Sequence, residues 1–216
     1  KIWINMKINE IFFSIQGEST YAGLPCVFVR TTFCHLRCTY CDTKYAYYDG
    51  VEQSIDQIVD KIITFPTKLV ELTGGEPLLQ AEIDPLAKKL LDLSYTVLIE
   101  TSGTLDVRKI DSRVIKIWDF KTPDSGEHLK NHYESLAFLT AQDEIKFVIC
   151  SEADYIWSKE IIKQFSLTDK HTVLMSAAFE TQSRQTLAEW ILHDGLNVRF
   201  QLQMHKFIWA PETIGV

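Results

Sequence analysis

The chain has 216 residues, of which 46% are hydrophobic and 24% are charged, and its formal net charge is −7. This length suits a single domain spanning residues 1–216, and the composition is that of an ordinary globular protein. The acidic balance disfavours a nucleic-acid-binding protein, because phosphate contacts need clustered lysine and arginine. No apolar run approaches the ~20 residues of a membrane-spanning helix.

The N-terminus has no apolar segment followed by a small-residue cleavage site. We therefore expect no secretory signal and a cytoplasmic location. Lys1 is not an initiator residue, whereas Met6 can serve as a native start. Residues 1–5 are accordingly expected to be a cloning remnant or an N-terminal extension.

Short β-branched runs alternate with longer stretches of helical periodicity along the chain. The expected strands are Cys26–Arg30, Leu69–Leu72, Thr96–Glu100, Val114–Asp119, Glu144–Ile149, Val173–Met175 and Val198–Leu202. The expected helices are Ser54–Thr64, Ala81–Leu91, Leu129–Thr140, Ala153–Phe165 and Gln182–His193. This alternation predicts an α/β fold with a parallel sheet. We expect an incomplete (β/α) barrel of about six parallel strands, since a full eightfold barrel typically needs ~250 residues.

Residues with chemical character follow the first four expected strands. They are Cys34, the segment Thr73–Pro77, the segment Thr101–Thr104 and the segment Lys121–Pro123. In parallel α/β folds the chemistry lies at the carboxyl ends of the strands. These loops are therefore expected to converge on one rim of the barrel.

Three of the five cysteines lie within eight residues, and two stand beside apolar runs. The first group is Cys34, Cys38 and Cys41, and the second is Cys26 and Cys150. We expect the second pair to be buried small hydrophobic side chains. The clustered group indicates metal binding rather than a disulfide framework. By spacing alone, a four-iron cluster with one open iron and a zinc site completed by His35 or a distant residue are equally consistent.

The segment Gly74–Pro77, Gly-Gly-Glu-Pro, follows the next expected strand. Two glycines allow the backbone to pass close to a ligand. Alone, this segment is consistent with an ordinary turn. Combined with a three-cysteine loop one βα unit upstream, it resembles the signature of the radical S-adenosylmethionine (SAM) superfamily. The resemblance implies that Cys34, Cys38 and Cys41 hold a [4Fe–4S] cluster whose open iron binds the amino and carboxylate groups of SAM.

Further segments resemble the 7-carboxy-7-deazaguanine synthases within that superfamily. They are Ile8–Glu18, Gly23–Pro25, Val27–Arg30, Leu36–Cys38, Cys41–Thr43, Glu100–Thr104, Asp119–Pro123, Glu144–Val148 and Gln201–Lys206. The resemblance covers the chain from about residue 6 to its end. Three positions depart from the family pattern: Phe33 and His35 replace the usual Gly and Asn around the first cysteine, and Ser19 replaces a frequent Gly.

The resemblance implies a lyase that makes the precursor of queuosine-type bases. It would convert 6-carboxy-5,6,7,8-tetrahydropterin to 7-carboxy-7-deazaguanine with loss of ammonia, using SAM as a regenerated cofactor together with Mg²⁺. It also implies a homodimer and a reducing partner such as flavodoxin or ferredoxin. Two rival interpretations are a glycyl-radical activase that acts on a large protein and a zinc-stabilised binding module.

The resemblance also assigns residues to the site, without implying a catalytic residue beyond the cluster. For SAM it implies Tyr40, Asp42, Gly75, Glu76, Ser102, Lys121 and Lys146, and for Mg²⁺ it implies Thr43. For the substrate it implies Ile15, Gln16, Gly17, Glu18, Arg30, Thr73, His205 and Val216. The planar fork of Arg30 suits a carboxylate, and Gln16 and Glu18 suit the amide and amine edge of a pterin. Outside this resemblance, these residues are consistent with ordinary surface, loop or structural roles.

Overall fold

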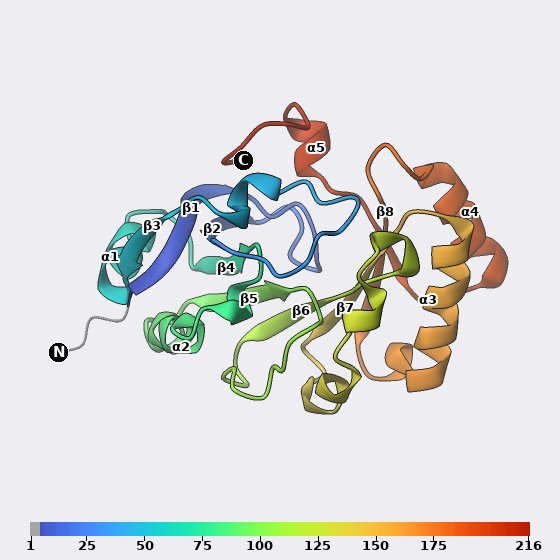
Figure 1. The fold of residues 1–216 in the computed structure, drawn as a ribbon, viewed down its shortest axis with the longest axis horizontal. Coiled ribbons are helices and arrows are strands. Elements are labelled where there is room, and N and C mark those ends of the chain that lie inside the picture. The colour runs from blue at the N-terminus through green and yellow to red at the C-terminus, as the bar shows by residue number, and fades with distance from the viewer. Residues whose placement is uncertain (1–4) are drawn as a thin grey trace.

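The computed structural model describes residues 5–216. Residues 1–4, most of the expected remnant or extension, lie outside the described residues. One nine-stranded sheet runs through the described chain in the order β3-β1-β2-β4-β5-β6-β7-β8-β9. No pairing joins β3 to β9 among these residues, so the sheet curves without closing, as expected for an incomplete barrel (Figure 1).

Seven strands form the parallel part of the sheet. They are β2 (Pro25–Thr31), β4 (Leu69–Gly74), β5 (Thr96–Thr101), β6 (Ile115–Phe120), β7 (Glu144–Ile149), β8 (Thr172–Ala177) and β9 (Arg199–Gln201). Each coincides with an expected strand. Two strands that the sequence analysis did not predict, β1 (Asn5–Ile15) and β3 (Val51–Ser54), extend one edge in antiparallel pairing.

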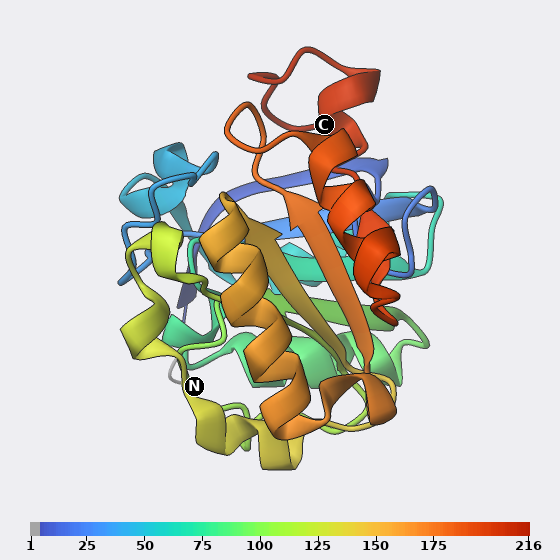
Figure 2. The same ribbon diagram turned by 90° about the vertical axis from the view of Figure 1, so that its right-hand side faces the viewer.

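Four of the five expected helices form and pack on the outer face of the sheet. They are α1 (Ile55–Ile62), α2 (Ile83–Asp92), α3 (Glu152–Phe165) and α4 (Arg184–Asp194). The first two pack against β1, β2, β4 and β5, and α3 and α4 pack against β7 and β8 (Figures 1 and 2). Ser54 caps α1, where its side chain and that of Gln57 form a reciprocal capping box.

The helix predicted over Leu129–Thr140 is wrong. This segment contains two short 3₁₀ turns, η4 (His128–Lys130) and η5 (Tyr133–Phe138). Between them, the Asn131 side chain accepts from the amide of Lys121 at 3.0 Å and donates to its carbonyl at 2.8 Å. The His132 amide donates to the carbonyl of Gly103 at 2.9 Å. These bonds tie the segment to the loops after β5 and β6 and prevent continuous helical hydrogen bonding.

Successive side chains on each strand alternate between the outer helices and the inside of the barrel. At the amino ends of the strands, the inner rows form an apolar plug of Cys26, Phe28, Leu69, Leu98, Ile115 and Ile117. Further along the same rows, the inner residues are polar or charged: Arg30, Glu71, Thr73, Glu100, Asp119, Lys121 and Lys146. The barrel is therefore closed at one end and has a polar wall at the other.

The remaining short elements lie mostly in loops. They are η1 (Lys44–Tyr47), η2 (Pro77–Leu79), η3 (Pro123–Ser125), η6 (Leu167–Asp169) and α5 (His205–Ile208). The last of these belongs to a C-terminal segment that passes over the carboxyl ends of the strands. Across residues 5–216, no helix combines the length and apolar character needed to cross a bilayer.

Candidate active site

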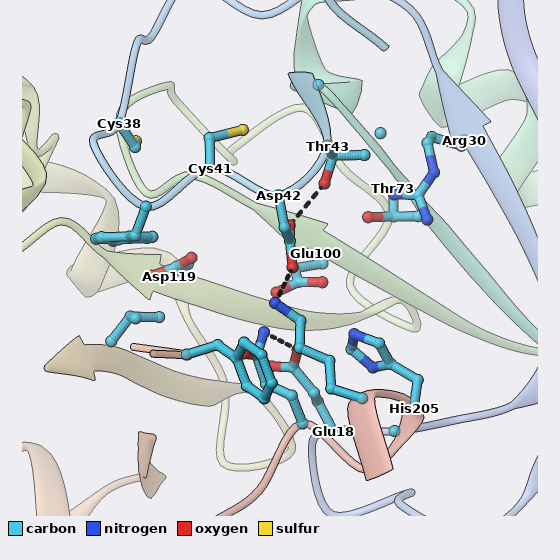
Figure 3. Close-up of a pocket in the computed structure, with 18 of the residues that line it drawn as sticks. Glu18, Arg30, Cys38, Cys41, Asp42, Thr43, Thr73, Glu100, Asp119 and His205 are labelled. Carbon is cyan, nitrogen blue, oxygen red and sulfur yellow. Dashed lines mark hydrogen bonds and ion pairs between the residues drawn. The ribbon is translucent and has the colours of Figure 1, made fainter. Parts of the chain in front are cut away.

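A cavity of about 710 Å³ opens at the carboxyl ends of the parallel strands. It is bounded by the loop after β1, the cysteine loop after β2, the ends of β4 to β7 and the C-terminal segment. Figure 3 shows Cys38 and Cys41 toward one end and Arg30 toward the other, with Glu18 and Glu100 between them. The loops that were expected to meet at one rim thus line a common space.

All but one of the residues assigned from the sequence line this cavity. They are Ile15, Gln16, Gly17, Glu18, Arg30, Cys34, Cys38, Tyr40, Cys41, Asp42, Thr43, Thr73, Gly75, Ser102, Lys121, Lys146, His205 and Val216. The exception is Glu76, which is completely buried behind the wall. The structure brings the assigned residues together, and their individual roles stay predictions.

The cysteine loop and the Gly-Gly-Glu-Pro segment pack directly against each other. An added Cβ at Gly75 would lie 2.2 Å from the carbonyl oxygen of Phe33 and 2.9 Å from the Cβ of Cys34. The amide of Glu76 also donates to the Phe33 carbonyl at 2.7 Å. The absence of a side chain at Gly75 therefore lets the two segments touch. This packing role is additional to the close approach of a ligand that the sequence analysis expected.

The three clustered thiols are free, half-buried and exposed to the same cavity. Burial raises the pKa of the Cys34 thiol, and it raises that of Cys38 to about 11 against the opposing effect of Lys121. Three sulfur donors from one loop match the ligand type of an iron–sulfur cluster with one iron left open. The donor set therefore fits the cluster implied by the sequence.

The zinc alternative lacks its nearby fourth ligand. The Nε2 atom of His35 lies 2.8 Å from Oγ1 of Thr104, and His35 does not line the cavity. Cys26 is buried as expected, but Cys150 is partly exposed, contrary to expectation, and lies outside the cavity lining.

Glu76 connects the ends of two strands to the cysteine loop. Its carboxylate accepts from the Ser102 amide at 2.7 Å and from the Thr101 hydroxyl at 2.9 Å. The Ser102 hydroxyl also contacts Glu76 and lies 2.8 Å from that of Thr104, which contacts His35. A continuous polar chain thus runs from the end of β4 through the loop after β5 to the residue beside Cys34. Glu76 positions the wall rather than facing the cavity.

Two buried lysines on the wall are paired with carboxylates, of which the sequence analysis assigned Glu18 and missed Glu100 and Asp119. The ammonium of Lys146 contacts Glu18 and lies 2.7 Å from Glu100, and that of Lys121 lies 2.8 Å from Asp119. Although burial lowers the pKa of Lys146, these neighbouring carboxylates raise it well above the usual value. The sequence pattern could have indicated Glu100 and Asp119 as cavity residues, since each occupies the inner row of its strand beyond the apolar plug.

The opposite end of the cavity is aromatic and cationic. The Nε atom of Arg30 lies 2.7 Å from Oε1 of Glu10, which also accepts from the hydroxyl of Tyr45 at 2.9 Å. The guanidinium lies 5.6 Å from the ring centre of Phe12, which stacks on Phe28. The Glu10 contacts hold Arg30 in place beside a flat apolar surface. This combination suits an aromatic ligand that carries an anionic group.

The C-terminal segment is attached to the rim by polar contacts. Lys206 forms an ion pair with Asp42 at 2.8 Å, and the Met204 amide donates to Gly17 at 3.0 Å. A Cβ at Gly17 would lie 2.7 Å from Nδ1 of His205, so glycine is needed for this approach. Burial lowers the pKa of His205, which favours the neutral imidazole. Against the effect of burial, Lys206 lowers the pKa of Asp42 to about 2.

Glu71 is a further cavity residue that the sequence analysis missed. Its side chain is buried on β4 and accepts a hydrogen bond from the Gln16 amide nitrogen. Burial, with the nearby charges of Glu100 and Glu18, raises the pKa of Glu71 well above its usual value. Glu71 therefore binds a proton in the folded chain under conditions in which it would be ionised in the unfolded chain.

We expect Glu71→Gln to stabilise the fold increasingly as pH rises above about 4.5, the ordinary glutamate pKa. Between the ordinary pKa and the raised folded-state pKa, Glu71 is protonated in the native state and ionised in the unfolded state. The free energy of unfolding of the wild type therefore falls as pH rises through this window, by about 1.4 kcal/mol for each unit by which the pKa is raised. The substituted amide would keep an acceptor for Gln16 without titrating. Thermal unfolding from pH 4.5 to 8 measures the difference, with Glu160→Gln on the exposed face of α3 as control. A difference that does not change with pH would contradict the assignment.

Comparisons with known proteins show the family of the chain. Residues 28–120 match the radical SAM superfamily. The chain is 46% identical to 7-carboxy-7-deazaguanine synthase of Koribacter versatilis over 98% of this chain and 100% of the relative. It is 44% identical to the enzyme of the same name from Chlorobaculum tepidum, over 98% of this chain and 97% of the relative.

The fold is also similar to that of a solved structure. The crystal structure of QueE from Escherichia coli superposes with a TM-score of 0.76 and covers 91% of this chain and 94% of its own, at 20% identity. The likeness confirms the predicted incomplete α/β barrel. Because the relatives of the same name align over nearly the whole chain at 44–46% identity, the chain belongs to the 7-carboxy-7-deazaguanine synthase family of radical SAM enzymes.

Proposed function

We propose that this chain converts 6-carboxy-5,6,7,8-tetrahydropterin to 7-carboxy-7-deazaguanine with loss of ammonia. The observation that supports this most strongly is the 46% identity, over nearly the full length of both chains, to a relative named for that product. The cavity is consistent with it, since one end carries three thiols and the other a cation beside aromatic rings. A radical cofactor and a pterin carboxylate would therefore each have matching chemistry.

The cluster and SAM follow from membership of the superfamily. Radical SAM enzymes use a [4Fe–4S] cluster and SAM, which together supply a 5′-deoxyadenosyl radical when bound. We assign Cys34, Cys38 and Cys41 as the cluster ligands. Gly75 and the Tyr40 hydroxyl are assigned to SAM, since that hydroxyl is buried and has no hydrogen-bond partner among the described residues. An unpaired buried hydroxyl is costly, so a ligand that satisfies it would be favoured.

The pterin end is assigned to the residues around Arg30. The guanidinium would pair with the substrate carboxylate while Glu10 fixes its orientation. Gln16 would present its carbonyl and amide groups to the ring edge, although its amide is already engaged with Glu71. The neutral imidazole of His205 can donate one hydrogen bond to a carboxylate. Together these groups would bind and orient the substrate and exclude water from it.

Several further features are proposed from the family. Mg²⁺ would bind at Thr43, whose hydroxyl lies 2.9 Å from the Asp42 carboxylate, because this cation prefers hard oxygen ligands. The chain would act as one domain, as a cytoplasmic homodimer, and receive electrons from a flavodoxin or ferredoxin. The one continuous sheet supports the single domain.

Arg30→Ala is expected to raise the KM for the pterin at least tenfold while leaving SAM binding unchanged. Loss of a charge-assisted hydrogen bond costs about 1.5–3 kcal/mol, and about 1.4 kcal/mol corresponds to tenfold in affinity. Steady-state kinetics and an equilibrium titration with SAM measure the two effects. Arg108→Ala, which breaks an exposed pair with Asp106, is the control. An unchanged KM would remove Arg30 from the substrate site.

The proposed reaction is tested by anaerobic incubation of the reconstituted, reduced protein with SAM, Mg²⁺ and 6-carboxy-5,6,7,8-tetrahydropterin, followed by mass analysis. Formation of 7-carboxy-7-deazaguanine and ammonia is the expected result. Formation of 5′-deoxyadenosine without 7-carboxy-7-deazaguanine would contradict the proposed substrate, whereas the proposed radical cleavage of SAM would still hold. Omitting Mg²⁺ and adding a chelator in parallel tests the role of the cation.

A further inference from the structure

The loop that follows β6, residues 122–130, is ordered by its own hydrogen bonds, and we call it the β6 loop. Asn131 closes its base through the two bonds to the backbone of Lys121. Inside the loop, the Ser125 hydroxyl donates to the Thr122 carbonyl at 2.6 Å. None of the residues 122–130, all of which the structure describes, lines the cavity. Contact with a ligand in the cavity therefore does not explain why the loop is so closely bonded.

A buried carboxylate at the start of α3 fixes the β6 loop to the body of the fold. Asp154 is completely buried. Its Oδ1 atom accepts from the Asp124 amide at 2.9 Å. Its Oδ2 atom accepts from the Thr122 hydroxyl at 3.0 Å and from the Cys150 amide at 3.0 Å. Because hydrogen bonds to a carboxylate are among the stronger ones in proteins, Asp154 holds the loop firmly against α3 and the end of β7.

The β6 loop contacts the cysteine loop on both sides of Cys38. On one side, the Glu127 carboxylate accepts from the Arg37 amide at 2.6 Å. On the other side, the Thr39 amide donates to the Ser125 carbonyl at 3.1 Å, and the Thr39 hydroxyl donates to the preceding carbonyl of the loop at 2.7 Å. In Figure 2 the yellow-green β6 loop lies beside the blue cysteine loop. The backbone is therefore fixed immediately before and immediately after Cys38.

The other two clustered cysteines are held by other parts of the rim. Cys34 packs directly on Gly75, at the end of β4. The residue after Cys41 forms the ion pair with Lys206 of the C-terminal segment. Three separate parts of the chain thus place the three thiols, and the β6 loop is the part that serves Cys38.

We propose that Glu127 and Asp154 are positioning residues for the thiol of Cys38 and hence for the cluster. Neither residue lines the cavity. Glu127 acts through the backbone of Arg37, and Asp154 acts through the β6 loop and Thr39. Groups that orient metal ligands change metal affinity or activity by about 10–100-fold when they are removed. This proposal rests on the proposed function, in which Cys38 is a cluster ligand.

The first test compares Glu127→Ala with Glu127→Gln, which keeps an oxygen as acceptor for the Arg37 amide. Glu134→Ala, an exposed position further along the same segment, is the control. In the reconstituted protein, Glu127→Ala is expected to lose its cluster to an iron chelator about tenfold faster than wild type, and the other two variants at nearly the wild-type rate. Hydrogen exchange of residues 37–39 should accelerate in Glu127→Ala alone.

Unchanged cluster loss or unchanged hydrogen exchange in Glu127→Ala would overturn the role of Glu127. If Glu127→Gln lost its cluster as fast as Glu127→Ala, the ion pair with Lys130 would be responsible instead of the bond to Arg37, and the positioning role would be wrong.

The second test uses Asp154→Asn, which replaces one acceptor oxygen by a donor group. Glu152→Gln, an exposed acidic position in the same first turn of α3, is the matched control. Below the melting temperature of each variant, we expect faster cluster loss and altered electron paramagnetic resonance g values of the reduced cluster in Asp154→Asn alone. If that variant does not fold, Thr39→Val, which removes only the hydroxyl bond to the loop, provides the same comparison. A wild-type spectrum together with a wild-type rate of cluster loss would overturn the role of Asp154.

Hydrogen exchange of the full chain before reconstitution separates this proposal from the proposed function. It reports the contacts on both sides of Cys38 whether or not a cluster is bound. If the wild type formed no cluster or no 7-carboxy-7-deazaguanine, the proposed function would fail. The exchange comparison would still decide whether the β6 loop holds this part of the cysteine loop.

Discussion

Cys38→Ala is expected to abolish product formation and to reduce the iron and sulfide content of the reconstituted protein sharply. Cys38 faces the cavity with the other two clustered thiols, and the described chain offers no fourth cysteine in the cavity lining to replace it. Loss of one thiolate leaves two ligands for a four-iron cluster. Metal and sulfide analysis, electron paramagnetic resonance of the reduced protein and the product assay measure the effect.

Cys150→Ala is the matched control for this prediction. Cys150 is also a partly exposed free thiol, and Cys38 is among the groups that raise its pKa, but it does not line the cavity. We expect this variant to retain the cluster and at least half of the wild-type rate. A wild-type rate in Cys38→Ala would refute its assignment as a ligand. Loss of the cluster in Cys150→Ala would show that the ligand set had been misassigned.

Lys146→Met is expected to cause the largest loss of stability. The buried ammonium balances the charges of Glu18 and Glu100, and its removal leaves two carboxylates beside each other within the wall. Breaking a buried ion pair by removing one partner costs about 3–5 kcal/mol. For a chain of this size, such a loss lowers the melting temperature by roughly 10 °C or more. Thermal unfolding followed by circular dichroism measures it.

The pH dependence of Lys146→Met distinguishes an electrostatic loss from a packing loss. Against the effect of burial, Lys146 lowers the pKa of Glu100, so its stabilising effect is present above pH 4.5 and is lost as pH falls through the lowered folded-state pKa. The deficit of the variant should therefore be largest near neutral pH and smaller in acid. Lys89→Met, which breaks an exposed pair with Asp56, should change stability by less than about 1 kcal/mol. A deficit independent of pH would indicate lost packing alone.

The parallel strands were predictable because local sequence and tertiary environment agree there. Each strand of this part is a short apolar or β-branched run, and β7 (Glu144–Ile149) begins and ends where expected. The antiparallel β1 was missed because its apolar residues alternate irregularly with Lys7, Asn9 and Glu10 across a bulge in its pairing with β2. Its inclusion in the sheet depends on partners that are distant in the sequence.

The wrong helix prediction and the unpredicted attachment of the C-terminal segment to the rim both result from contacts between residues that are distant in the sequence. Helical periodicity around Asn131 is overridden by hydrogen bonds to the backbone of Lys121. The ion pair between Lys206 and Asp42 joins residues that lie far apart in the sequence, and no local pattern encodes it. Sequence reasoning therefore identified many cavity residues by type and motif, but not Glu71, Glu100 or Asp119. It did not identify the long-range contacts that hold them.

Among those contacts, the polar chain through Glu76, Ser102, Thr104 and His35 has a consequence for how the cysteine loop can be disturbed. Both oxygens of the Glu76 carboxylate accept hydrogen bonds, and the chain ends at the residue after Cys34. The cysteine loop is thus connected by side chains to the ends of β4 and β5. A displacement of either strand end would therefore be passed on to the loop that carries the thiols, without any change in the cavity lining itself.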